Sequence, residues 1–171
     1  MENKFNILKH IVEQAVLKFN AKELYLIEND LSERCICAKF ATYITEVLQD
    51  TEFYSFIVDV EYNRGVNGKE DGVKKIDNNP ITVDLIVHKR GYDGVQGFIN
   101  LICIEMKKST DRRGCADDEA RLQKMCSYEY RFCYSAGFMI LVNMNEKRLE
   151  IKKSFKLKNY LDNSLFVGID N

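Results

Sequence analysis

Two apolar runs joined by a polar, glycine-containing turn make up residues 81–109, which read ITVDLIVHKRGYDGVQGFINLICIEMKKS. The runs predict two neighbouring β-strands, and each carries charge at positions where a buried strand carries apolar side chains. Asp84 interrupts the first run, and Glu105 and Lys107 interrupt the second. Because strand side chains alternate between the two faces of a sheet, Glu105 and Lys107 share one face, and a hairpin can bring Asp84 onto it.

These three charged side chains form a candidate site because their burial is costly. Neighbouring strands lie ~4.8 Å apart, so the carboxylates of Asp84 and Glu105 can converge on one cation. A buried charge needs a partner or a metal ion to offset its lost hydration. Two interpretations of Asp84, Glu105 and Lys107 therefore stay open, a metal site and a structural cluster of ion pairs.

Composition restricts the class of protein. A chain of 171 residues, 46% hydrophobic and 30% charged, is typical of one globular domain with its own core. Its formal net charge of −1 gives no overall basic field, so a nucleic-acid-binding surface has to be a local patch. The six cysteines lack C-x-x-C spacing and are expected to be reduced and mostly buried rather than zinc ligands. No secretory signal or membrane span is visible, so we expect a cytoplasmic protein without a membrane partner.

The order of apolar patterns predicts an α/β sandwich with a mixed sheet. Helices are expected over residues 4–19 and about 30–48, the second capped by Ser32, and again from about 117 to 132. Strands are expected over residues 53–64, 81–90, 100–109 and 136–143. We expect residues 25–27 to be a connector, residues 65–79 a loop, and the single domain to divide into residues 1–28, a core over 29–145, and a basic strand or tail over 146–171.

Asp84 followed by Glu105-Met106-Lys107 resembles the signature of the PD-(D/E)XK nuclease superfamily, which has the restriction-endonuclease-like fold. That signature is an Asp on one strand and (Asp/Glu)-x-Lys on the next. The proline of the motif is not directly before the Asp here, since Pro80 lies four residues earlier. The resemblance covers roughly residues 29–145 and implies an αβββαβ core flanked by helices.

The resemblance also implies a chemistry, the metal-dependent hydrolysis of phosphodiester bonds in DNA. Asp84 and Glu105 would bind Mg²⁺ or Mn²⁺, with the Met106 carbonyl as a further oxygen ligand. Lys107 would orient the attacking water or stabilise charge that develops in the transition state. RNA as a substrate and a homodimer as the active form stay open.

Two further carboxylates are candidates near this centre. Glu33 lies one turn before Cys37 on the inward stripe of the second helix, and SERCICAKFATYI, residues 32–44, resembles the superfamily helix that often supplies a metal-binding Glu. The alternative is a first-turn Glu that complements the helix dipole, worth about 0.3–1 kcal/mol. Glu61 lies on the polar face of the first strand, where it would support the ligands, act as one, or face solvent.

Several polar residues are candidates for contact with a nucleic-acid backbone. They are Arg64, Lys89, Arg90, Lys108, Arg112, Arg113 and Gln123. For each of them the alternative is a solvated surface position. The basic tail is a further candidate patch, although lysine on an edge strand also protects against aggregation.

Two functions therefore remain. The first is a Mg²⁺-dependent DNA nuclease. The second is a module of the same fold in which catalysis is dispensable, and which binds nucleic acid or a protein partner in host–phage conflict.

Overall fold

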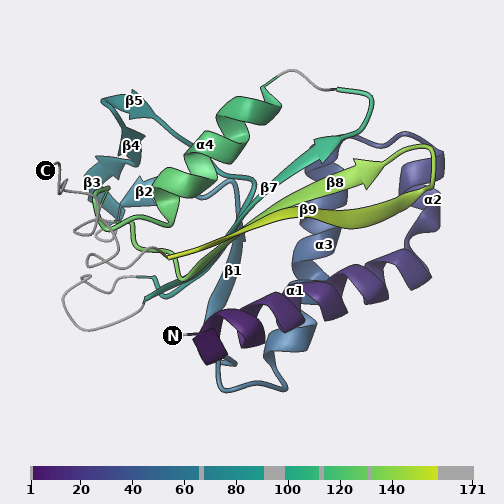
Figure 1. The fold of residues 1–171 in the computed structure, drawn as a ribbon, viewed down its shortest axis with the longest axis horizontal. Coiled ribbons are helices and arrows are strands. Elements are labelled where there is room, and N and C mark those ends of the chain that lie inside the picture. The colour runs from purple at the N-terminus through teal and green to yellow at the C-terminus, as the bar shows by residue number, and fades with distance from the viewer. Residues whose placement is uncertain (1, 66–67, 91–98, 112–113, 131, 158–171) are drawn as a thin grey trace, which may run out of the picture.

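The computed structural model describes residues 2–65, 68–90, 99–111, 114–130 and 132–157, which form an α/β structure around a five-stranded sheet (Figure 1). The helices are α1 (Glu2–Lys22), α2 (Leu24–Glu28), α3 (Glu33–Leu48) and α4 (Cys115–Met125). The strands of the central sheet are β1 (Ile57–Val60), β6 (Leu85–His88), β7 (Asn100–Lys108), β8 (Ala136–Asn143) and β9 (Arg148–Lys156). Two small hairpins pair β2 (Arg64–Gly65) with β3 (Gly68–Val73) and β4 (Lys75–Ile76) with β5 (Asn79–Pro80).

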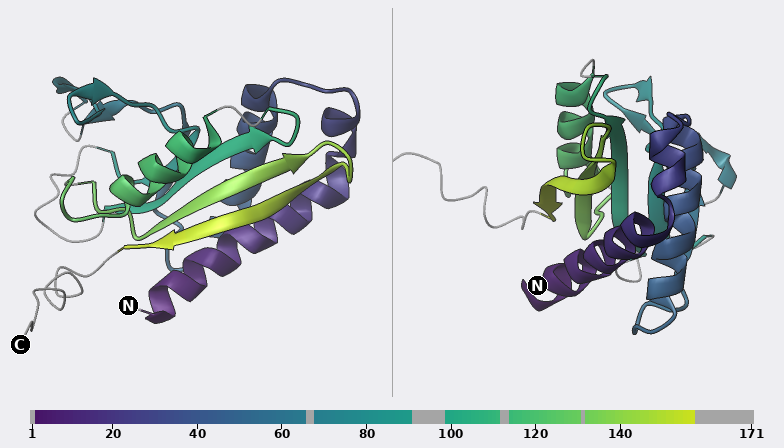
Figure 2. Two further views of the ribbon diagram at one scale, coloured as in Figure 1. Left: turned by 45° about the horizontal axis from the view of Figure 1, so that its top comes forward. Right: turned by 90° about the vertical axis from the view of Figure 1, so that its right-hand side faces the viewer.

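The central sheet is mixed, with the strand order β1-β6-β7-β8-β9. Strands β7 and β8 are parallel and the other neighbouring pairs are antiparallel. Helix α4 makes the crossover that a parallel pair requires. Helices α1 and α3 cover one face of the sheet and α4 covers the other (Figure 2). The expected α/β class, with a mixed sheet flanked by helices, is therefore confirmed.

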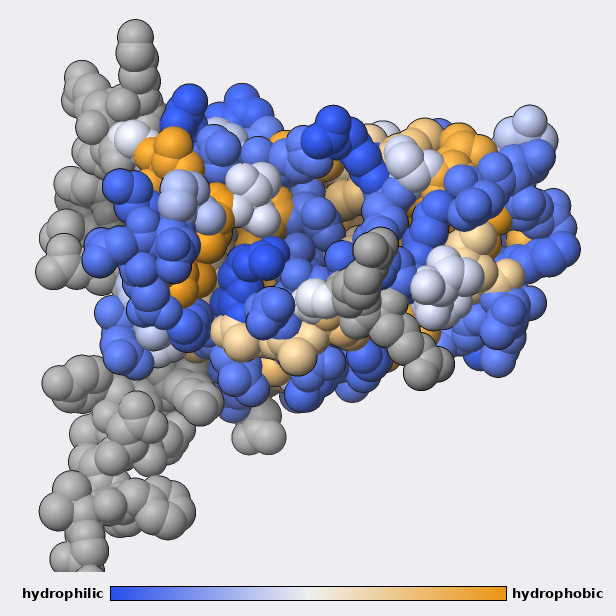
Figure 3. Space-filling model, turned by 90° about the horizontal axis from the view of Figure 1, so that it is seen from above, coloured by the Kyte–Doolittle hydropathy of each residue, from blue (hydrophilic) through white to orange (hydrophobic). Residues whose placement is uncertain are grey.

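Two apolar clusters join these layers, one on each face of the sheet. The cluster beneath α1 and α3 includes Phe19, Phe40 and Ile104, and the cluster beneath α4 includes Cys103 and Leu122. Because residues alternate along β7, the side chains of odd-numbered residues near its end face α4. Seen from above, the molecule presents mostly hydrophilic residues with small apolar areas between them (Figure 3).

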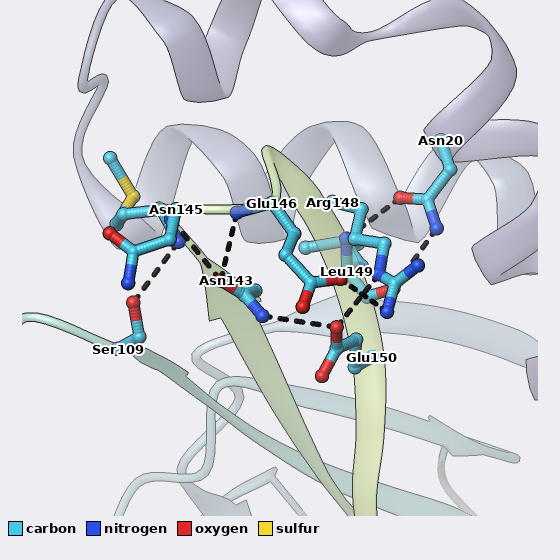
Figure 4. Close-up of polar contacts among 9 residues, drawn as sticks. Asn20, Ser109, Asn143, Asn145, Glu146, Arg148, Leu149 and Glu150 are labelled. Carbon is cyan, nitrogen blue, oxygen red and sulfur yellow. Dashed lines mark hydrogen bonds and ion pairs between the residues drawn. The ribbon is translucent and has the colours of Figure 1, made fainter.

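The turn between β8 and β9 is fixed to both of its neighbours (Figure 4). The amide of Asn20 in α1 donates to the Leu149 carbonyl at 3.0 Å, and the Leu149 N–H donates to Asn20 Oδ1 at 2.7 Å. The Met144 N–H donates to Ser109 Oγ at 3.0 Å, just past the end of β7. These contacts tie the β8–β9 turn to α1 on one side and to the end of β7 on the other.

Several predicted boundaries were wrong. Residues 24–28 form helix α2 instead of a connector, and residues 65–79 include short hairpins instead of only a loop. Strand β1 covers 57–60 instead of 53–64, because turns precede it and Glu61 adopts a left-handed φ of 52° after it. Helix α4 ends at Met125, well before residue 132, because the Met125 carbonyl accepts the N–H of Tyr134 from the returning chain at 3.0 Å.

Asp84 also lies differently from the prediction, immediately before β6 instead of inside a strand. The Asp84 carbonyl accepts the Glu61 N–H at 3.0 Å, while its side chain accepts the Met106 N–H at 2.7 Å. Strand β7 continues beyond the point where it pairs with β6, and there the Asp84 carboxylate accepts the Met106 N–H in place of a backbone carbonyl. Among the described residues, no helix has the length and apolar character needed to cross a membrane.

Candidate functional site

Asp84 and Glu105 lie opposite each other at the end of the β6–β7 pair. Leu85 of β6 pairs with Ile104 of β7 in an antiparallel register. Asp84, which precedes Leu85, therefore lies opposite Glu105, which follows Ile104. Burial raises the pKa of Asp84, while the Met106 N–H and a hydrogen bond from the Glu105 carboxyl oppose that increase. The two carboxyl groups are therefore near enough to change each other's pKa.

Glu105 is the most deeply buried member of the site, at 3% exposure. Burial raises its pKa well above the usual range, Asp84 raises it further, and the guanidinium of Arg121 opposes both. Arg121 reaches Glu105 from α4, where its Nη1 donates to Glu105 Oε1. A buried carboxylate is thus balanced by a cation on one side and a second acid on the other.

Lys107 lies two residues beyond Glu105 on the same face of β7 and meets α4 through Asp118. Its Nζ is 3.5 Å from Asp118 Oδ2, and Asp118 Oδ1 is 3.2 Å from Arg121 Nη2. Burial lowers the pKa of Lys107, but Asp118 and Glu33 raise it by more, and the net effect is an increase. A row of alternating charge therefore runs from Glu105 through Arg121 and Asp118 to Lys107.

Helix α3 brings Glu33 to this cluster. Ser32 caps the helix as predicted, since its Oγ accepts the Cys35 N–H at 3.2 Å, and Glu33 begins the first turn. One turn later the Cys37 thiol donates to the Asp84 carbonyl at 3.5 Å, which fixes this edge of α3 beside the site. Burial raises the pKa of Glu33, and the charges with the largest effect on it are Lys107, which lowers it, and Asp84, which raises it.

The structure thus brings together Asp84 from the segment before β6, Glu105 and Lys107 from β7, and Glu33 from the start of α3. The Met106 backbone lies between Glu105 and Lys107 and contacts Asp84 through its N–H. Glu61 begins the segment after β1 and pairs with Arg34 at 2.7 Å on an exposed edge beside α3.

The basic candidates are distributed over different parts of the fold. Lys108 adjoins the site and binds Asp30 Oδ1 at 2.6 Å. Arg90 follows β6 at the opposite end of the sheet and pairs with Asp59, its Nε 2.8 Å from Oδ2. Lys89 lies at that same end, its Nζ 4.9 Å from the centre of the Phe56 ring.

Arg64 is exposed at the start of β2, and Gln123 is exposed on α4. The predicted contacts of Arg112 and Arg113 lie outside the described residues. Among the basic candidates that the structure describes, Lys108 is thus the one that follows directly on Lys107.

Sequence reasoning did not assign Asp118 and Arg121 to the site. A signal was nevertheless present, because Asp118 precedes Leu122 and Met125 at helical spacing and so belongs to the buried stripe of α4. Arg121 stands three residues after Asp118, the separation at which helical side chains pair.

The donor set at this site suits a hard divalent cation. Within the part of the chain that the structure describes, no group of three or more His, Cys, Asp or Glu side chains is arranged to hold a metal ion. Mg²⁺, however, is commonly held by one or two carboxylates together with water and substrate phosphate. Asp84 and Glu105 are two carboxylates at one junction, and the charge of Asp84 raises the pKa of Glu105, a repulsion that a cation would relieve.

Comparisons of the chain with protein-family models, with curated proteins and with solved structures found no match.

Proposed function

We propose that this protein is a metal-dependent nuclease of the PD-(D/E)XK type that hydrolyses phosphodiester bonds in DNA. The observation that carries the proposal is the meeting of Asp84 and Glu105 across β6 and β7, with Lys107 next on the same face. The order α3, β1, β6, β7, α4, β8 supports it, since it follows the αβββαβ core that the resemblance implies.

In this proposal Mg²⁺ or Mn²⁺ is held by Asp84 and Glu105, with the Met106 carbonyl and Glu33 as further oxygen donors. Such an ion supplies a Lewis acid and lowers the pKa of a bound water. Binding requires the ionised carboxylates, and both have raised pKa values, so metal affinity should increase with pH.

Lys107 contributes a positive charge beside the reacting phosphate. Its pKa is raised overall, by Asp118 and Glu33 against the effect of burial, so it stays protonated at neutral pH. A protonated lysine donates hydrogen bonds and stabilises negative charge on phosphoryl oxygens, but it does not accept a proton from water. Its role is therefore to orient the water or stabilise the transition state.

A second function has an observation in its favour. Glu105 is already paired with Arg121, and Lys107 with Asp118, so the charges of the cluster are balanced by protein side chains. Such a network of ion pairs can have a purely structural role, without taking part in catalysis. The protein would then be a module of this fold that binds nucleic acid or a protein partner without cleaving it.

An assay of DNA cleavage separates these functions. The protein is incubated with supercoiled, linear and single-stranded DNA in the presence of Mg²⁺ or Mn²⁺, alongside Asp84→Asn and Lys107→Ala. The matched control is Asp77→Asn, which alters an exposed carboxylate that pairs with Lys124 on the same helix α4 but outside the cluster. We expect cleavage by the wild type and the control, and none by the two site variants. Equal cleavage by all four proteins would point to a contaminant and end the proposal.

A further inference from the structure

A cavity of about 310 Å³ opens where β7 ends and α4 begins, and it shares Lys107 with the candidate site. Three lysines line it, Lys107, Lys108 and Lys152, together with Ser109, Asp111 and Cys115. Its volume lies at the small end of the range for ligand pockets, about 300–1,000 Å³. This cluster is called the lysine pocket below.

The lysines reach the pocket from two strands on either side of β8. Lys107 and Lys108 end β7, and Lys152 comes from β9. Leu141 of β8 pairs with Lys107 and lies between the two strands in the pocket wall. The three lysines therefore line one pocket because of the sheet order and not because of their spacing in the sequence.

Each ammonium group is held in place by a neighbour. Lys108 Nζ binds Asp30 through both Oδ1 at 2.6 Å and the carbonyl oxygen at 3.2 Å. Lys152 Nζ lies 3.2 Å from Cys115 Sγ and 3.6 Å from Glu119 Oε1. These contacts fix the positions of the charges before any ligand arrives.

The lysines keep hydrogen-bonding capacity for a ligand. The carboxylates nearest to Lys107 and Lys152, those of Asp118 and Glu119, are 3.5 Å and 3.6 Å away, which is longer than the usual range of an N–H···O hydrogen bond. An ammonium group has three donors, so one such contact leaves others to point elsewhere.

Helix α4 adds to the attraction for an anion. Its first residue, Cys115, lines the pocket, and the preceding Gly114 has no side chain with which to cap the helix. The N–H groups of a helix start carry partial positive charge and commonly meet phosphate oxygens. Asp111 is the carboxylate of the lining, and the carboxylates of Asp30, Asp118 and Glu119 lie beside the three lysines, so an anion is attracted by their remaining N–H donors rather than by a net positive charge.

We propose that the lysine pocket binds a phosphate group of the nucleic-acid strand, one that neighbours the phosphodiester to be cleaved. The assignment rests on the proposed function for its biological ligand, because Lys107 belongs to both the pocket and the site. It adds Lys152 on β9 as a residue that positions the strand. The bound phosphate would be either a strand end or an internal link.

The test compares two adjacent lysines. Lys152→Gln removes a charge from the lysine pocket, whereas Lys153→Gln removes one from a residue that contacts the same Glu119 at 2.6 Å and is not part of the lining. Binding of inorganic phosphate is measured by calorimetry on the full chain at low ionic strength without divalent cations. We expect Lys152→Gln to weaken binding about tenfold, as for loss of a charge-assisted hydrogen bond, and Lys153→Gln to leave it within about twofold.

Two additions keep the result decisive. Lys152→Arg retains the charge and should retain phosphate binding, which excludes a general loss of folding as the cause.

Oligonucleotides with and without a 5′-phosphate distinguish the two sources, since a preference for the phosphorylated one indicates a strand end and equal binding indicates an internal link. Absence of phosphate binding by the wild type, or equal losses in Lys152→Gln and Lys153→Gln, would overturn the inference. Because the experiment measures phosphate binding and not cleavage, its result can be interpreted even if the protein is not a nuclease.

Discussion

Replacing Arg121 by methionine removes the cation that faces Glu105 while keeping a side chain that can fill much of the same space. In the wild type, Glu105 is 3% exposed and the Arg121 side chain is 27% exposed. Without the guanidinium, the buried carboxyl group faces Asp84 with no compensating charge from α4. We therefore expect Arg121→Met to destabilise the fold in a pH-dependent way.

The size of this effect follows from burial and from the pKa of Glu105. Leaving one partner of a buried ion pair unpaired costs about 3–5 kcal/mol. Partial exposure of Arg121 and uptake of a proton by Glu105 reduce this, so we expect about 2–3 kcal/mol at about pH 8. For a chain of this size that is a decrease in melting temperature of roughly 4–12 °C.

The direction in which pH changes the stability difference between the wild type and Arg121→Met follows from the pKa of Glu105. The folded-state pKa of Glu105 is raised above its ordinary value by burial and Asp84, and Arg121 opposes that increase. Removing Arg121 raises the pKa further, so the variant loses stability relative to the wild type as pH rises from about 5 to about 8. At the lower pH a larger fraction of the Glu105 carboxyl group is protonated in both proteins, so the difference between them should be smaller there.

Urea denaturation at the two pH values measures this, with Arg34→Met as the matched control. Arg34 pairs with Glu61 at 2.7 Å, but its side chain is 75% exposed, so its loss should change stability by less than about 1 kcal/mol at either pH. Saturating Mn²⁺ should recover part of the Arg121→Met loss, because the ion supplies the missing positive charge. Equal effects of the two substitutions, or a loss in Arg121→Met that does not vary with pH, would refute the reasoning.

Three further substitutions test the structure at other points. Gly137→Ala should destabilise by about 1–3 kcal/mol in urea, because the new Cβ would lie 3.0 Å from Cys126 Sγ; an unchanged midpoint would contradict that packing. Ser32→Ala should cost about 1 kcal/mol through loss of the cap on the Cys35 N–H, whereas Ser32→Thr should retain most of it. Burial lowers the pKa of Lys74 to about 8, so the wild type should lose stability relative to Lys74→Met as pH falls from about 10.5 to about 8. A constant difference between those two proteins over that range would show that Lys74 is not buried as described.

The parts of the fold that sequence could predict are those with strong local signals. Strand β8 matches its predicted range of 136–143, because a continuous apolar run between polar segments suits a strand buried on both faces. Ser32 was predictable as a helix cap because it precedes an acidic first turn. The α/β class followed from the same local patterns.

The features that sequence could not predict depend on tertiary contacts. The end of α4 at Met125 is set by the N–H of Tyr134, which returns to it after a turn. The left-handed conformation of Glu61 cannot be read from residue type, since Glu has no preference for positive φ. The hairpins within residues 65–79 lack the alternating apolar pattern by which strands are recognised.

In the candidate site, too, some features could be predicted from the sequence and others depend on tertiary contacts. The grouping of Asp84, Glu105 and Lys107 could be predicted because strand periodicity and hairpin pairing are local rules. The partners that hold the charges could not, since Glu105 pairs with Arg121, 16 positions away, and the adjoining Lys108 pairs with Asp30, 78 positions away. No periodicity encodes such separations.

A crystal structure obtained with Mn²⁺ would show whether Asp84 and Glu105 hold a divalent cation. We expect an anomalous scattering peak within coordination distance, about 2.2 Å, of oxygen atoms from both carboxylates, with Arg121 displaced from Glu105. Full-occupancy pairs between Glu105 and Arg121 and between Asp84 and the Met106 N–H, with no such peak at saturating Mn²⁺, would contradict it.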